Sequence, residues 1–283
     1  MSVRIICDST CDLTPALKER VDITHLTVHF GEEDFIDGVE LTAHDFYEKL
    51  ASSDVMPSTS QATPFAFGEA FEAAVNEGHE VVCITCSSGL SGTYQSAVIA
   101  AGDFDGKVYV VDSRNIALSS AIMVEYALRL ADEGKSAAAI AEELTAVREK
   151  VHLFAVVDTL EYLQRGGRVS KAVAIAGGML NIKPVITVAD GEIKVLGKAR
   201  GSRQGNNLLV QEIEKAGGVD FSRPLMLGYT GLSDALLQKY MVDSAAMWEG
   251  KRENLPCSVI GSVVGTHAGP GAVAVAFFAS DFE

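Results

Sequence analysis

The sequence predicts an α/β protein: an N-terminal parallel sheet with flanking helices, followed by a C-terminal α+β domain with a mixed or antiparallel sheet. Three observations support this. Strand-like and helix-like segments alternate through the first half, as in parallel sheets. The second half carries several strand-like segments and a hairpin signal, which favours antiparallel pairing. The chain has 283 residues, of which 48% are hydrophobic, enough to bury a substantial core.

Short apolar runs and helical stretches alternate in the first half. The runs that predict strands are 3–9, 23–30, 81–85 and 108–113. The helices predicted between them begin at Pro15, near His44, at Pro64 and after Ser91. Two further helical stretches, 119–134 and 137–150, complete this half, the second with apolar residues at helical spacing and charges opposite.

The second half is dominated by predicted strands. They are 153–157, the two arms of 183–200, 224–230, 258–265 and 272–279. ADGE at 189–192 is the hairpin signal, since Asp-Gly suits a tight turn between paired strands. We therefore predict a parallel α/β domain over 1–153 and an α+β domain with a mixed sheet over 154–283.

The composition disfavours several classes of function. The net charge of −15 argues against nucleic acid and anionic membranes, because both reward clustered Lys and Arg. The first residues lack the basic lead and long apolar run of a signal peptide, and no apolar run reaches about 18 residues, so we expect a cytoplasmic protein without stable membrane insertion. Cys83 and Cys86 form C-x-x-C inside a strand-like run, where residues three apart face opposite ways, so we expect no metal there.

Hydroxyl-rich loops follow the predicted strands. Ligands of open parallel sheets bind beyond the carboxyl ends of the strands, and the loops CDSTCDL, CSSGLSG and VDSRNIALSS lie there. The stretch MPSTSQATP precedes another helix. Unpaired N–H groups and the helix dipole suit an anion at such places. The alternative is that serines such as Ser88 or Ser91 merely cap a helix.

The loop at 86–92 does not match common catalytic or nucleotide-binding motifs. Gly89-Leu90-Ser91-Gly92 lacks the second spacer of a G-x-S-x-G elbow. The chain contains neither G-x-x-x-x-G-K-[ST] nor G-x-G-x-x-G. Arg200, at the end of the predicted hairpin, and His267, in GTHAGPGA, would complete a carboxylate or phosphate site if the two halves met at a cleft.

Taken together, the loops resemble the DegV family, in order and nearly from end to end. The motifs that carry the resemblance are DSTCDL at 8–13, STSQATP at 58–64, SSGLSGTYQSA at 87–97, VDS at 111–113, LEYLQRGGRVS at 160–170, LNIKPVI at 180–186, GKARG at 197–201 and GTHAGPGA at 265–272. Cys11 stands where many members have alanine, and Ala62 replaces the proline common after TSQ. Neither departure removes a hydrogen-bonding group.

The resemblance implies a two-domain protein that holds a long-chain fatty acid, C14 to C18, in a buried tunnel at the domain interface. It further implies kinship with the fatty-acid-binding subunits of bacterial fatty acid kinase, which present the carboxylate to a separate ATP-dependent kinase subunit for acyl phosphate formation. The carboxylate contacts carried over by motif are Thr59 or Ser60, Ser88, Arg200 and His267. No catalytic residue, metal or cofactor is implied for this chain.

Two enzymatic readings stay open as alternatives. One is a Ser/His acyl hydrolase that uses Ser88 or Ser91 with His267, although no acidic orienter is identifiable. The other is a small-molecule phosphotransferase, although no carboxylate pair has evident metal spacing. Asp8, Asp12 and Asp112 are better explained as helix caps.

A local basic cluster predicts the surface that meets the kinase. Arg165, Arg168 and Lys171 lie within seven residues, around an exposed bend at Gly166-Gly167. Their alternative role is to solvate a surface turn or pair with nearby carboxylates. If they face an acidic partner, they would mainly accelerate association, with an effect that fades as salt rises.

Overall fold

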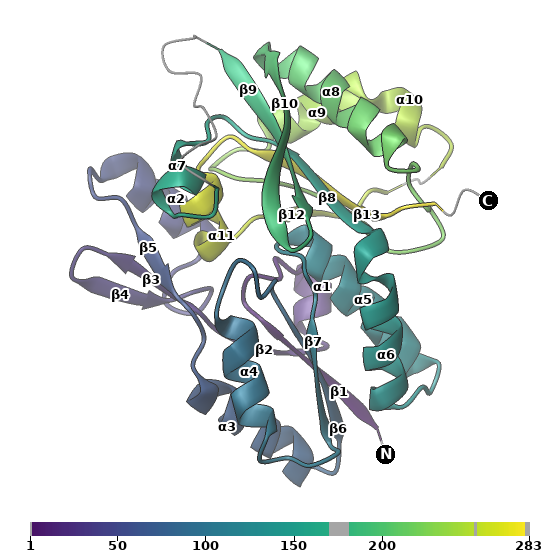
Figure 1. The fold of residues 1–283 in the computed structure, drawn as a ribbon. Helices are drawn as coiled ribbons and strands as arrows, with labels where there is room; N and C mark the ends of the chain where they lie inside the picture. The colour runs from purple at the N-terminus through teal and green to yellow at the C-terminus, as the bar shows by residue number, and fades with distance from the viewer. Residues whose placement is uncertain (1, 170–180, 252–253, 281–283) are drawn as a thin grey trace.

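The computed structural model describes residues 2–169, 181–251 and 254–280 (Figure 1). The N-terminal sheet has the order β2-β1-β6-β7, and every neighbouring pair is parallel. Its strands are β1 (Val3–Asp8), β2 (Asp22–Thr24), β6 (Glu80–Thr85) and β7 (Val108–Asp112). This is the predicted parallel sheet.

Helices cover both faces of this sheet, because its strands are apolar on both sides. Ile5 and Cys7 pack with the helices α5 (Leu118–Asp132) and α6 (Ala137–Val147). Ile6, between them, packs on the opposite face with α3 (Pro64–Asn76) and α4 (Thr93–Ala101). Figure 1 shows these two helix pairs on either side of the strands.

The second large sheet has the order β10-β9-β8-β13-β11-β12. It is mixed, since β11 pairs with β12 in parallel and the other neighbouring pairs are antiparallel. Its strands are β8 (Val151–Val156), β9 (Ile182–Ala189), β10 (Glu192–Arg200), β11 (Leu225–Tyr229), β12 (Cys257–Val259) and β13 (Val273–Phe278). The predicted α/β class, with a parallel sheet followed by a mixed one, is confirmed.

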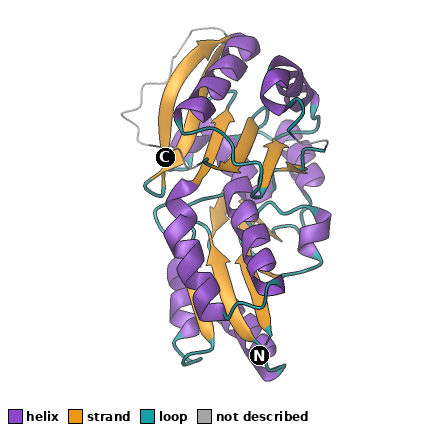
Figure 2. Cartoon of the chain, turned by 90° about the vertical axis from the view of Figure 1, so that its right-hand side faces the viewer, coloured by secondary structure: helices purple, strands orange, loops and turns teal. Residues whose placement is uncertain are grey.

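One face of this second sheet meets the N-terminal half. The other face, with Phe154 and Val156 of β8, packs under α8 (Gly201–Lys215), α9 (Ala235–Asp243) and α10 (Ala245–Trp248). Leu153 and Ala155, which alternate with them along β8, belong to the same apolar cluster as α5. The two large sheets occupy the upper and lower parts of Figure 2, with the N-terminal sheet below.

The N-terminal half also contains a small antiparallel sheet, β4-β3-β5. Its strands are β3 (Thr27–Phe30), β4 (Glu33–Ile36) and β5 (Ser58–Ser60). The remaining described helices are α1 (Pro15–Lys18), α2 (Ala43–Ser52), the 3-10 turn η1 (Arg148–Lys150), α7 (Glu161–Arg165) and α11 (Ser262–Ala268). Among the described residues, no helix is both long and apolar enough to cross a membrane.

Two predicted strands differ from the structure. The run 23–30 is divided between β2 of the parallel sheet and β3 of the small sheet. The run 258–265 was predicted as one strand, but it ends at Val259 and α11 begins at Ser262. The division at residue 153 stays a prediction, and that residue lies inside β8.

Candidate functional site

An apolar cavity lies between the second sheet and the N-terminal half. Its volume is about 100 Å³, several times the roughly 10–15 Å³ that one water molecule needs. Most of its lining is aliphatic: Leu26, Leu90, Ile116, Ala117, Leu153, Ala155, Val157, Leu163, Ile186, Ile193, Ile260, Val263, Val264, Ala268, Ala272 and Ala274. The remaining lining residues are Thr10, Thr59, Cys86, Ser91, Arg168 and His267.

Small side chains on neighbouring strands leave room for this cavity. Ala155 of β8 pairs with Ala274 of β13, and both line the cavity. Val157 lies toward the end of β8 that is nearer α11, and Leu153 lies four residues back along the chain, about 13 Å at the usual strand rise. Ile193 of β10, which pairs with Val188, lines the cavity at this Leu153 end. The lining therefore runs along β8 from α11 toward Leu153 and Ile193.

His267 and Thr59 bring the two halves of the chain together at the α11 end. His267 Nε2 lies 3.0 Å from Thr59 Oγ1, and the two residues are 208 positions apart. α11 also packs against α2, α7, β3 and β5. Two of the predicted contacts, Thr59 and His267, are thus neighbours at the cavity.

His267 is a neutral imidazole at physiological pH. Burial lowers its pKa to about 4, with a smaller contribution from the neighbouring Arg168 guanidinium. Its Nδ1 lies against Gly166, where a Cβ would collide with it, and has no hydrogen-bond partner among the described residues. A buried nitrogen acceptor without a partner costs less free energy than a buried N–H without a partner. The surroundings of Nδ1 therefore favour the tautomer that carries hydrogen on Nε2.

Arg168 lines the cavity, whereas the sequence pattern placed it on a docking surface. Its Nε donates to the carbonyl of Leu90 at 3.2 Å, and its Nη1 donates to the carbonyl of Gly166 at 2.6 Å. These bonds connect the loop after β6 with the turn after α7. Arg165, by contrast, is exposed and paired with Glu161, and Lys171 lies outside the described residues.

Ser91 is a cavity residue that the family motifs do not single out. From the sequence it is a candidate nucleophile or helix cap, and the resemblance implies Ser88 as the carboxylate contact. Its Oγ lies 2.9 Å from Thr93 Oγ1 and accepts the Thr93 N–H, as a residue preceding α4 would. The position of Leu90 and Ser91 at the cavity could have been found only from the backbone path of this loop.

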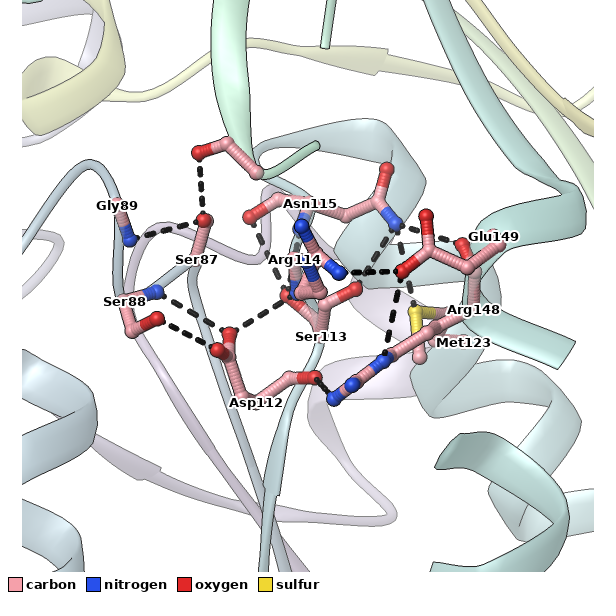
Figure 3. A network of polar contacts seen from close by, with 11 residues as sticks. Ser87, Ser88, Gly89, Asp112, Ser113, Arg114, Asn115, Met123, Arg148 and Glu149 are labelled. Atoms are coloured by element: carbon pink, nitrogen blue, oxygen red, sulfur yellow. Dashed lines mark hydrogen bonds and ion pairs between the residues drawn. The ribbon is translucent and has the colours of Figure 1, made fainter. Parts of the chain in front are cut away.

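Ser88 points into a different polar network (Figure 3). Its Oγ donates to Asp112 Oδ2 at 2.6 Å, and its N–H donates to Oδ1 of the same carboxylate. Asp112 Oδ1 also accepts the N–H of Arg114. Arg114 Nη1 in turn donates to Glu149 at 2.9 Å. Ser88 is exposed and does not line the cavity.

The other two predicted contacts also lie away from the lining. Ser60 follows Thr59 along β5 and faces the opposite side, where its Oγ is 2.6 Å from His29 Nε2. Arg200 ends β10 in an exposed position, and its backbone N–H donates to Gln204. The structure thus brings together Thr59, His267, Ser91 and Arg168.

No metal centre is formed by the chain over residues 2–169, 181–251 and 254–280: no group of three or more His, Cys, Asp or Glu side chains could hold an ion. Cys83 is buried in the core against α3 and α4, whereas Cys86 lines the cavity. Burial raises the pKa of both thiols well above the usual value, so neither is a ready thiolate.

Comparison with known proteins gives a consistent result over the whole chain. The family model described as "Uncharacterised protein, DegV family" matches residues 2–280. A DegV domain-containing protein of Caldanaerobacter subterraneus subsp. tengcongensis is 35% identical over 279 residues, covering 97% of this chain and 98% of the relative.

Solved structures share the fold. A DegV family protein from Thermus thermophilus, described for its fatty acid binding, has a TM-score of 0.87 and 30% identity, covering 98% of this chain and 100% of that one. A stearic acid-binding protein from Eubacterium ventriosum has a TM-score of 0.85 and 28% identity, with 97% of each chain covered. The protein described here belongs to the DegV family.

Proposed function

We propose that this protein binds a long-chain fatty acid, with the tail in the apolar cavity and the carboxylate beside Thr59 and His267. The observation that carries the proposal is a cavity that has an aliphatic lining and, at its α11 end, Thr59, His267 and Arg168. The relatives from Thermus thermophilus, described for its fatty acid binding, and from Eubacterium ventriosum, described as a stearic acid-binding protein, support the same class of ligand.

The tail supplies most of the affinity. Each buried methylene contributes about 0.8 kcal/mol, so a tail of about fifteen methylenes offers roughly 12 kcal/mol before the costs of ordering are subtracted. A hydrogen bond to the carboxylate adds only about 1–3 kcal/mol. The polar end therefore acts mainly by fixing where the carboxylate lies.

The polar end suits a carboxylate. In the tautomer with hydrogen on Nε2, His267 donates to Thr59 Oγ1 and leaves the Thr59 hydroxyl hydrogen for the ligand. Arg168 keeps N–H donors beyond those that bind Leu90 and Gly166, and its charge offsets that of the carboxylate. Ser91 lies in the same lining.

We further propose that the bound carboxylate is presented to a separate ATP-dependent kinase subunit in the cytoplasm, with Arg165 and Lys171 on the docking surface. Arg168 would then contact both the ligand and the partner.

Reversal of Arg165 to glutamate is expected to slow coupled acyl phosphate formation at low ionic strength while leaving fatty acid affinity unchanged. Unchanged coupling would remove Arg165 from this surface.

Hydrolysis fits the site less well. Nε2 of His267 faces a threonine, and its Nδ1 has no carboxylate partner in the part of the chain that the structure describes. A Ser-His pair normally needs both a serine on one nitrogen and an orienting group on the other.

Native mass spectrometry of protein purified from a bacterial host tests the binding proposal. The expected result is an adduct whose mass matches one C14 to C18 fatty acid and which palmitic acid restores after delipidation. Turnover of a long-chain ester by the protein alone, or failure of the delipidated protein to bind palmitic acid, would overturn the proposal.

A further inference from the structure

Two buried carboxyl groups outside the cavity hold the helix that carries His267. Asp12, in the loop after β1, and Asp37, after β4, are 7% and 4% exposed. Neither lines the cavity. Both face the segment that leads into α11, which is more than 220 residues away along the chain.

Side chains from the N-terminal half bind three consecutive residues before and at the start of α11. Asp12 Oδ1 accepts the N–H of Gly261 at 2.6 Å. Asp37 Oδ1 accepts the hydroxyl of Ser262. Tyr47 of α2 donates its hydroxyl to the carbonyl of Ile260 at 2.9 Å.

Close packing leaves this segment little freedom to shift. A Cβ on Gly261 would lie 2.9 Å from Asp12 Oδ1, and a Cβ on Gly265 would lie 2.5 Å from Tyr47 Oη and 2.8 Å from Phe46 Cε1. Contacts shorter than 3 Å are not tolerated by carbon, so only glycine allows this approach.

His267 lies at the other end of the same short helix. α11 has seven residues, which is about 10 Å of helix, and its backbone ties the segment at 260–262 to His267. The Thr59 that meets His267 belongs to β5, in the same half of the chain as Asp12 and Asp37. The N-terminal half therefore positions Thr59 directly, because β5 belongs to it, and positions His267 indirectly, through its contacts with the start of α11.

We propose that Asp12 and Asp37 are positioning residues, which set the His267–Thr59 geometry by holding the start of α11. Burial is the main cause that raises the pKa of both carboxyl groups, and the charged or titratable groups that face them, besides each other, are Asp8, Lys18 and His25. The free-energy cost of burying the two carboxyl groups is offset because each supplies a hydrogen-bond acceptor, Asp12 for the Gly261 N–H and Asp37 for the Ser262 hydroxyl. The proposal rests on the proposed function only for its binding readout.

A double-mutant cycle with palmitic acid tests the proposal. Asp12→Ala is expected to lower affinity about tenfold in the wild-type background, and less than about twofold in a Thr59→Val background, because both changes remove the same interaction. Asp12→Asn keeps an acceptor oxygen for Gly261 and should restore most of the affinity. Asp105→Ala, at an exposed position, is the matched control and should change nothing.

Additive losses in the two backgrounds would overturn the proposal, since they would show that Asp12 affects binding independently of Thr59. If Asp12→Ala fails to fold, Tyr47→Phe, which removes only the hydroxyl on Ile260, enters the same cycle with the same expectation. The imidazole NMR signals of His267 give a readout without a ligand: they should shift in Asp12→Ala and not in Asp105→Ala. Unshifted signals would also overturn the proposal, even if the wild type bound no fatty acid.

Discussion

Thr59 and Ser60 are adjacent hydroxyl residues that the strand directs to opposite sides. Thr59 reaches His267 and the cavity, whereas Ser60 reaches the half-buried His29. The TSQ motif contains both and cannot distinguish them, because the assignment depends on which face of β5 is turned toward α11. The same holds for Ser88 and Ser91, where only the folded loop shows that Asp112 binds Ser88 while Ser91 meets the cavity.

Replacing Thr59 with valine should therefore weaken fatty acid binding about tenfold, as expected for the loss of roughly 1–1.5 kcal/mol from one hydrogen bond. Ser60→Ala is the matched control and should bind as the wild type does. Titration of delipidated protein with palmitic acid measures both. Equal losses in the two variants would show that this part of β5 affects binding without contacting the carboxylate.

His267 makes a definite contribution to the pH dependence of stability. Its pKa is lowered from 6.5 to about 4 in the folded protein, so the unfolded chain binds more protons between these values. Stability is therefore lost as the pH falls from 6.5 toward 4. Relative to His267→Gln, the wild type should lose about 3 kcal/mol across this window.

Urea unfolding of both proteins at several pH values checks this. The comparison with His267→Gln is needed because burial raises the pKa values of Asp8, Asp12 and Asp37, and these groups act in the opposite direction: their stability contribution grows as the pH falls. Parallel curves for the two proteins would show that the imidazole is not buried as described.

At the scale of elements, the loop after β6 and the β9–β10 turn fit closely together. Ser87 Oγ donates to the carbonyl of Gly191 at 2.6 Å, and a Cβ on Gly89 would lie 2.7 Å from that same carbonyl oxygen. The hairpin carries Ile186 and Ile193 of the cavity lining. The contact therefore joins the polar loop of one half to the cavity wall supplied by the other.

Gly89→Ala should displace this turn and destabilise the protein by about 1–3 kcal/mol, the usual cost of forcing an extra methyl into a packed contact. Gly68→Ala is the control: Gly68 lies within α3, with open space around its Cα, so alanine there should stabilise by about 0.5–1 kcal/mol. Thermal unfolding distinguishes the two. Stabilisation by Gly89→Ala would mean that the loop and the turn are not in contact.

The sequence predicts best those elements whose secondary structure is determined by their own residues. β1 and β6 are short apolar runs largely buried on both sides, and β7 is a half-buried apolar run at the edge of the sheet. All three form where the pattern predicts them. The first four residues of α11, 262–265, are predicted as the end of a strand because SVIGSVVG is rich in β-branched residues. The segment is helical where Asp12, Asp37 and Tyr47, which lie far away in the sequence, form hydrogen bonds with residues 260–262.

At the scale of the molecule, the cavity depends on both halves, and no single segment predicts it. β8 and β13 contribute Ala155 and Ala274, the loops after β6 and β7 contribute Leu90 and Ile116, and α11 contributes His267. The family motifs could indicate Thr59 and His267 because these residues lie within short patterns. The positions of Arg168 and the aliphatic residues at the cavity depend on how the second sheet packs on the N-terminal half, which no short motif indicates.

A crystal structure with a palmitic acid brominated at its terminal carbon would show how the fatty acid is oriented in the cavity. We expect the anomalous bromine peak toward Leu153 and Ile193, with carboxylate density beside Thr59 and His267. A bromine peak beside His267, or lipid density outside the cavity, would contradict this expectation.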